Sequence, residues 1–133
     1  MAPSEYAKKC RKGAAKDSAA LQHAFGLLHY NGEEGVKRDL ATAAEWFQKA
    51  ATQGLPGAQA LLGGMYARGE GVERDMKQAV VWLRKAASQN PESYDKYQGE
   101  SILNARRNLT KAYDDGGEGG SHKAPLFSST LCS

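Results

Sequence analysis

The stretch GVERDMKQAVVWLRKAASQN, from Gly71 to Asn90, decides the fold because nearly the same pattern occurs twice in the chain. Its other copy is GVKRDLATAAEWFQKAATQG, from Gly35 to Gly54, which lies 36 residues earlier. Gly-Val, Arg-Asp, Ala, Trp, Lys, Ala-Ala and Gln recur at matching places. Self-similarity at a fixed period of about 20 to 50 residues is typical of proteins built by stacking like units.

The repeat extends on both sides of these stretches. Upstream, LQHAFGLLHYNG (residues 21–32) realigns on AQALLGGMYARG (residues 58–69). Downstream, ARRNLTKAYDDGGEG (residues 105–119) is a partial third copy, separated from the second by ten extra residues within NPESYDKYQG (residues 90–99). We interpret this insertion as a longer connection between hairpins, with room for one turn of helix.

Each copy carries the signals of two helices joined by a tight loop. Apolar residues recur at helical spacing on both sides of Gly69-Glu-Gly71, whose glycines suit positive φ angles. Asp75 stands at the N-cap position of the second helix, and Gly54 and Asn90 are predicted to end the second helices in the left-handed conformation. Helices are predicted near residues 4–12, 18–31, 39–53, 57–68, 75–89 and 101–115.

Small and aromatic residues at repeat positions indicate how the helices pack. Gly63 and Gly26 lie inside first helices, where glycine costs about 1 kcal/mol relative to alanine, so each is predicted to mark a close helix crossing. Trp46 and Trp82 fall beside the apolar stripes of the second helices and are predicted to be packing residues.

These residues resemble the Sel-one-like repeat (SLR), a branch of the tetratricopeptide repeats. Its pattern is Ala, then Leu-Gly, a Tyr three residues on, Gly-x-Gly-Val, an Asp, and then Ala, Trp and Lys-Ala-Ala. The match is nearly complete over residues 58–89 and good over 21–54, with His29 in place of Tyr, Leu21 in place of Ala and Thr110 in place of Gly. The resemblance implies an all-α fold, a short α-solenoid of antiparallel helix hairpins with about two full repeats plus flanking helices.

The predicted organisation has five parts. In the first part, EYAKKCRKG is interpreted as a degenerate second helix, with Tyr6 and Lys9 in the places of Trp46 and Lys49. The parts are an N-terminal capping helix (1–17), a first repeat (18–54), a second repeat (55–90), a connection with a closing helix (91–119), and a flexible or docking tail (120–133).

The tail GGEGGSHKAPLFSSTLCS begins as a Gly-rich linker and then becomes apolar. Three interpretations stay open for its apolar residues: they cover the last helix, they insert into another protein, or they are disordered. The residues concerned are Pro125, Leu126, Phe127 and Leu131.

Composition and charge are those of an ordinary globular domain, with 133 residues, 41% hydrophobic and 25% charged residues, and a formal net charge of +3. The only basic cluster, Lys8, Lys9, Arg11 and Lys12, has no interleaved aromatic residues and is interpreted as the solvated face of a terminal helix. We therefore expect no nucleic-acid partner. No run is apolar enough to span a membrane and the start has no apolar leader, so we expect a cytoplasmic protein, or an organellar one whose presequence has been removed.

Known catalytic and metal-binding patterns are missing from the sequence. There is no P-loop, dinucleotide-binding fingerprint or nucleophile elbow. Cys10 and Cys132 lie near opposite ends and are expected to be free thiols, and His23 and His29 point to different sides of a helix. We therefore expect no catalytic residue, no metal and no cofactor.

Three functions are compatible with these features. The resemblance implies a non-catalytic protein–protein interaction or scaffold module that binds a peptide or partner protein on its repeat surface. The alternative is an accessory structural subunit of a larger complex. A third hypothesis, a small β-lactamase-type hydrolase, follows some bacterial relatives, but those resemble secreted proteins with a cysteine pair in each repeat, which this chain lacks.

By analogy with tetratricopeptide repeats, the first helices are expected to line a concave binding surface. Its middle would be floored by Gly57, Ala60, Gly64 and Ala67, which let an extended backbone approach. Two arginines facing one groove favour an acidic or phosphorylated partner segment. The predicted binding residues are His23, Leu27, Tyr30, Asn31, Arg68, Arg107 and Lys111, and the same mapping adds Ala20, Asn104, Asp114 and Asp115.

Overall fold

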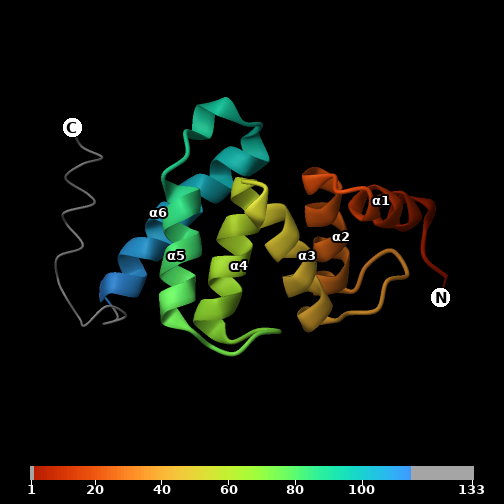
Figure 1. Cartoon of the computed structure of the whole chain (residues 1–133), viewed down its shortest axis with the longest axis horizontal. Helices are drawn as coiled ribbons and strands as arrows, with labels where there is room; N and C mark the ends of the chain where they lie inside the picture. The colour runs from red at the N-terminus through yellow and green to blue at the C-terminus, as the bar shows by residue number, and fades with distance from the viewer. Residues whose placement is uncertain (1, 115–133) are drawn as a thin grey trace.

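The prediction of an all-α solenoid is confirmed. The computed structural model describes residues 2–114, and within them it contains six α-helices, one short 3-10 helix and no strand. The helices follow one another along the long axis, with α1 at one end and α6 at the other (Figure 1). They are α1 (Glu5–Ala15), α2 (Ala19–Asn31), α3 (Leu40–Thr52), α4 (Pro56–Arg68), α5 (Met76–Ala87), η1 (Pro91–Ser93) and α6 (Lys96–Asp114).

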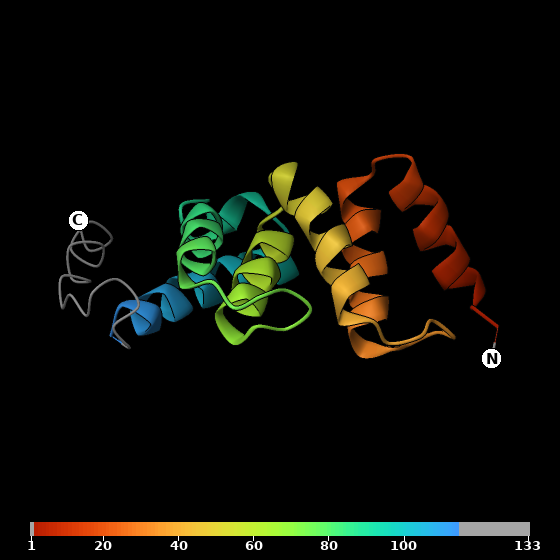
Figure 2. The same ribbon diagram turned by 60° about the horizontal axis from the view of Figure 1, so that its bottom comes forward.

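Two antiparallel hairpins, α2 with α3 and α4 with α5, form the middle of the stack (Figure 2). Each hairpin crosses at the predicted glycine. A Cβ at Gly26 would lie 2.7 Å from the ring of Phe47, and one at Gly63 would lie 2.8 Å from Cγ of Leu83. The missing side chain is therefore what lets the two helices of each hairpin approach.

The loops are set by residues at equivalent places in both copies. Gly32 and Gly69 end α2 and α4 with φ angles of 72° and 70°. Asp75 caps α5 by accepting hydrogen bonds from the amides of Lys77 and Gln78. The prediction for Asn90 is wrong: its φ is −87°, and its side chain instead caps η1 by accepting from the amide of Glu92.

The helix α1 has the contacts of a second helix, as predicted, but in a different register. The Gln22 side chain donates to the Ala14 carbonyl at 3.3 Å, as that of Gln59 donates to the Ala51 carbonyl at 3.1 Å. Asp17 has a φ of 66° where the next copy has a left-handed glycine. Ala14 is thus the counterpart of Ala51, so Lys9 and Cys10 occupy the repeat positions of Trp46 and Phe47. The sequence alignment was three residues off because α1 has no tryptophan to fix the register.

A ladder of long polar side chains links the helices of the stack, within each repeat through glutamine pairs and to the preceding unit through backbone carbonyls. Gln53 donates to the Gln22 side chain at 2.9 Å, and Gln89 donates to the Gln59 side chain at 2.8 Å. At the third rung Arg106 replaces the glutamine and donates to the carbonyls of Ala87 at 2.9 Å and Gln89 at 3.1 Å. The first two rungs also donate to a backbone carbonyl just after the end of a second helix, Gln53 to that of Asp17 and Gln89 to that of Gly54.

The closing helix starts earlier than predicted, at Lys96 and not near residue 101. Asp95 accepts a hydrogen bond from the amide of Gln98 at 2.9 Å, as Asp75 does from Gln78. The inserted residues are therefore partly the first turns of α6, with η1 before them. Because of these extra turns, α6 reaches α4 as well as α5.

The core runs through the stack and contains both tryptophans at its edge. Trp82 is 8% exposed and belongs to the central cluster with Phe47, Leu62 and Met65. Trp46 packs edge-on against Phe25, with ring centroids 5.5 Å apart. Both positions support the prediction that these side chains serve packing.

Candidate functional site

A groove lies between α4 and α6, and its volume is about 370 Å³. Its floor is made by small residues of α4, because Ala60 and Gly64 lie one helical turn apart on the face turned toward α6. Tyr97, Ser101 and Asn104 follow the same spacing along α6 and form the opposite wall. The groove thus has small side chains along α4 and polar side chains along α6.

The α6 wall can exchange hydrogen bonds in both directions. Asn104 and Asn108 are exposed carboxamides, each with two N–H donors and an acceptor oxygen. Ser101 is half-buried beside them, and its hydroxyl donates to the Tyr97 carbonyl at 3.1 Å. Carboxamides of this kind match the alternating N–H and C=O groups of an extended peptide.

One end of the groove is closed by a three-residue polar cluster. Arg68 Nη2 lies 3.1 Å from Glu70 Oε1, and the Tyr30 hydroxyl donates to the same oxygen at 2.8 Å. Burial opposes ionisation of Glu70, but the bonds from Tyr30 and Arg68 outweigh it and hold the pKa of this carboxyl below its ordinary value. The carboxylate that Arg68 holds is therefore that of the chain's own Glu70.

The other end is closed by the early start of α6. Gln98 accepts a hydrogen bond from the Gly57 amide at 2.6 Å, and the Tyr97 ring lies edge-on to His23 with centroids 5.5 Å apart. His23 is 4% exposed, and burial lowers its pKa to about 4. Its Nε2 has no hydrogen-bond partner among the described residues. His23 and Gly57 are thus covered by α6 and do not lie on an open surface.

The predicted binding residues are divided between several environments. Arg68 lines the groove, whereas Leu27 and Tyr30 are half-buried against the central core. Asn31, the last residue of α2, is exposed and donates to Glu33 at 3.3 Å. Arg107 and Lys111 are exposed on α6 but are not among the lining residues of the groove. Asp115 and the side chain of Asp114 lie outside the described part of the chain, as do Cys132, His122 and the apolar tail.

The sequence prediction found the floor of the groove and missed most of its wall. Ala60, Gly64, Arg68 and Asn104 were expected to face inward, and they line the same groove. Leu61, Tyr97, Glu100, Ser101 and Asn108 were missed. The available signal was Asp95 with Gln98 three residues on, which repeats the Asp75 and Gln78 pattern and marks the true start of the helix.

The groove is also not the basic surface that was expected. Glu100 lines it together with Arg68, and Glu70 already pairs with that arginine. Among the described residues no three His, Cys, Asp or Glu side chains are grouped so that they could hold a metal. Across residues 2–114, no helix is both long and apolar enough to cross a membrane.

Comparison with known proteins agrees with this architecture. The family model of the Sel1 repeat matches residues 18–55 and 56–91. The chain belongs to the Sel1 repeat family. Sel1 repeats are typically non-catalytic modules for protein–protein interaction, and the two matches coincide with the two hairpins.

Individual Sel1 relatives match this chain over only part of their length. It is 43% identical over 56 residues to the ERAD-associated E3 ubiquitin-protein ligase component HRD3A of Arabidopsis thaliana, covering 42% of this chain and 8% of that protein. Among solved structures, c5321, a protective antigen of uropathogenic Escherichia coli with an SLR fold, has a TM-score of 0.67 at 33% identity over 83% of this chain and 21% of its own. A Sel1 repeat protein from Oxalobacter formigenes has a TM-score of 0.62 at 29% identity, over 82% and 73% respectively.

Proposed function

We propose that this Sel1 repeat chain is a non-catalytic interaction module that binds an extended segment of a partner protein in the groove between α4 and α6. The observation that carries the proposal is the pairing of a small-residue floor, Ala60 and Gly64, with exposed carboxamides on the facing helix. A flat floor lets a peptide backbone come close. The carboxamides of Asn104 and Asn108 then bond its N–H and C=O groups.

The position of these side chains supports binding over a structural role. Asn104 and Asn108 are exposed, and asparagine is a weak helix former, so neither contributes much to the stability of α6. Arg68 lies at the end of the groove with its side chain 52% exposed, although it is paired with Glu70. It can therefore bond a peptide carbonyl or carboxylate without giving up its partner.

Selection of binders from a random peptide library displayed on phage, using the full chain, tests this function. Asn104→Ala combined with Asn108→Ala is expected to weaken the binding of a selected peptide by about tenfold. Each hydrogen bond lost between a carboxamide and the peptide backbone contributes roughly 0.5–1.5 kcal/mol. Gln48→Ala is the matched control, because Gln48 is an exposed carboxamide on α3, away from the groove. Equal binding by both variants would show that the groove is not the site.

A second candidate, the accessory subunit of a larger complex, is favoured by the two ends of the described stack. Helices α1 and α6 are single helices where the repeats have hairpins, and Tyr6 on α1 and Leu103 on α6 are 53% and 39% exposed. Partner helices packed on these ends would extend the solenoid. Size measurement with thermal melting of the purified chain separates the two functions, because a docked subunit should be unstable alone and an independent module should not.

A further inference from the structure

A second hollow, which we call the junction pocket, lies at the other end of the molecule, where α1, α2 and the loop after α2 meet. Its volume is about 220 Å³. Ala7, Phe25 and Val36 form an apolar floor. None of the residues that line the groove between α4 and α6 lines this pocket, so the two are separate surfaces.

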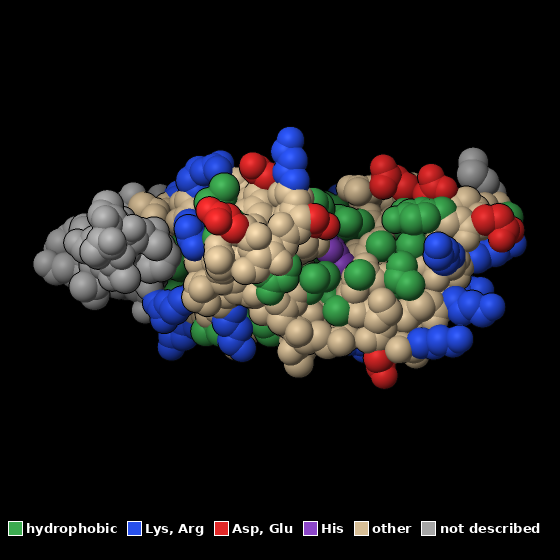
Figure 3. Space-filling model, turned by 90° about the horizontal axis from the view of Figure 1, so that it is seen from above, with side chains coloured by type: hydrophobic (Ala, Val, Ile, Leu, Met, Phe, Trp, Pro, Cys, Tyr) green, Lys and Arg blue, Asp and Glu red, His purple; other side chains and the backbone are tan. Residues whose placement is uncertain are grey.

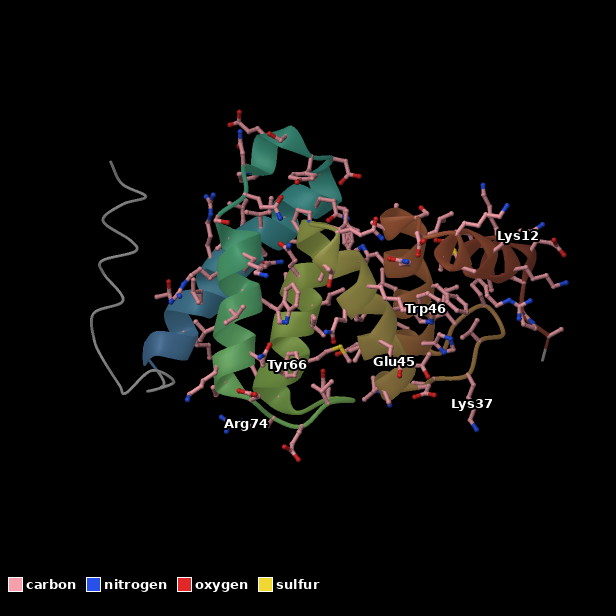
Figure 4. All side chains as sticks on the ribbon, viewed as in Figure 1. Lys12, Lys37, Glu45, Trp46, Tyr66 and Arg74 are labelled. Atoms are coloured by element: carbon pink, nitrogen blue, oxygen red, sulfur yellow. The ribbon has the colours of Figure 1, made fainter. Side chains whose placement is uncertain are left out.

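The rim of the junction pocket is basic. Lys8 and Arg11 stand one turn apart on α1, both exposed, and Lys37 contributes from the loop. In Figure 4 the Lys37 side chain points away from the helices, so its charge lies at the outer edge. Figure 3 shows lysine and arginine side chains gathered over the end of the molecule that α1 forms. The acidic groups nearby include Glu5, whose carboxylate lies 3.4 Å from Lys8 Nζ, Glu34 beside Tyr6, and Asp39, which interacts electrostatically with His29.

The second repeat contains the equivalent place, and it serves as an internal comparison. Gly35 lies against the backbone of Ala2 and Pro3 just before α1, and Gly71 lies in the same way against Leu40 and Ala41 at the start of α3. The register of α1 set by Ala14 and Ala51 then fixes which residues correspond. Lys8, Arg11, His29 and Lys37 take the places of Glu45, Gln48, Tyr66 and Glu73.

Two differences follow from this correspondence. The charge is inverted, because cations at the first junction stand where Glu45 and Glu73 stand at the second (Figure 4 labels Lys37, Glu45 and Tyr66). The space also differs. Tyr66 is half-buried and packs on the central core. The shorter His29 packs on Phe25 with ring centroids 4.8 Å apart, and its Nδ1 lies at hydrogen-bonding distance, 3.2 Å, from the Lys37 carbonyl oxygen. Replacement of the tyrosine of the pattern by histidine leaves room at the first junction.

We propose that the junction pocket is a second binding site, which takes an acidic segment of a partner protein with one apolar side chain on the floor. Carboxylates on either side of that anchor pair with Lys8 and Arg11, and arginine favours carboxylates through paired, charge-assisted bonds. The pocket holds one side chain, and the aromatic groups in its walls are the Phe25 edge and the His29 ring, which pack against each other. An acidic peptide therefore fits it better than a nucleic acid does.

Amide chemical shifts of the full chain, recorded by NMR during titration with a defined peptide, test the proposal. The probe is acetyl-Glu-Asp-Glu-Leu-Glu-Asp-Glu-amide, and its counterpart with Ala for Leu tests the anchor. Shifts are expected at Ala7, Phe25 and Val36, and the Ala peptide should bind about tenfold more weakly, as loss of one buried aliphatic side chain predicts. A single-stranded RNA and vesicles containing phosphatidylserine complete the set, and equal or tighter binding of either at these amides would overturn the proposal.

Two variants and one control make the test specific. Lys8→Glu with Arg11→Glu reverses the rim, and His29→Tyr fills the pocket with the residue that the second repeat uses; each should weaken the Leu peptide by at least about tenfold. Lys9→Glu with Lys12→Glu makes the same change of net charge on the same helix outside the pocket, and should weaken it by less than about threefold. Thermal melting shows that each variant is folded. No shift with wild-type chain at millimolar peptide, or equal loss in the control, would refute the junction pocket while leaving the groove untouched.

Discussion

Replacing either of two adjacent glycines of α4 by alanine should change the stability of the chain in opposite directions, with Gly63→Ala destabilising and Gly64→Ala stabilising. A Cβ at Gly63 would lie 2.8 Å from Cγ of Leu83 and 3.2 Å from the Ala79 carbonyl oxygen, both on the tightly packed α5. The nearest atoms to a Cβ at Gly64 would be those of the Arg68 guanidinium, at 3.1 Å and beyond. Backbone and a buried leucine cannot move easily, whereas the end of an exposed arginine can.

The magnitudes follow from two opposing terms. Alanine gains about 1 kcal/mol of helix propensity at either position. At position 63, overpacking against Leu83 and Ala79 costs about 1–3 kcal/mol, which leaves a net loss of about 1 kcal/mol. At position 64, displacement of the exposed ion pair between Arg68 and Glu70 costs a fraction of a kcal/mol. Gly64→Ala should therefore raise the free energy of unfolding by about 0.5 kcal/mol.

Thermal melting followed by circular dichroism measures both variants against the wild type. A difference of about 1.5–2 kcal/mol between them corresponds to about 6–8 °C in Tm for a chain of this size. Urea denaturation of the same proteins checks the sign. If Gly64→Ala destabilises as much as Gly63→Ala, the assignment of position 63 to the helix crossing and position 64 to the groove floor is wrong.

Three further predictions concern the core and the polar network. Trp82→Ala should cost about 3 kcal/mol in a urea titration and leave peptide binding in the groove intact, since its side chain is buried; lost binding at unchanged stability would reverse its assignment. The pKa of His23 is about 4 in the folded chain against an ordinary 6.5, so the unfolded chain binds a proton at a higher pH than the folded chain does. This contribution to the free energy of unfolding is fully present above pH 6.5 and should fall by about 3 kcal/mol as the pH drops to about 4. A His23→Phe variant should lose that slope, and an unchanged slope would place the titration elsewhere. Arg106→Met should cost about 2 kcal/mol, because it leaves the carbonyls of Ala87 and Gln89 without their partner; the exposed neighbour Arg107→Met is its control and should change nothing.

Local signals predicted the hairpins well because each helix has its own start and stop residues. Asp75 and the glycine-containing loops act within a few residues, and the crossing at Gly63 is repeated at Gly26. The register of α1 was harder to predict. Its correct alignment depends on the bond between Gln22 and the Ala14 carbonyl, a contact between helices that the α1 sequence does not reveal.

The candidate site was predicted in part, for a similar reason. Ala60 and Gly64 follow from the repeat pattern, whereas Tyr97 lies in the insertion, which has no counterpart in the other copies. Placing His23 on an open surface failed because that insertion lengthens α6 until it covers the histidine. Analogy between repeats predicts only the residues that the copies share, whereas one end of this groove is formed by residues that only one copy has.

The central claim, that a partner segment binds between α4 and α6, is tested most directly by NMR shift mapping with a library-selected peptide on the labelled full chain. The largest amide shifts are expected at Ala60, Gly64, Ser101 and Asn104, which face one another across the groove. They should disappear in the Asn104→Ala and Asn108→Ala double variant. Shifts confined to the outer faces of α3 and α5, unchanged in that variant, would contradict the claim.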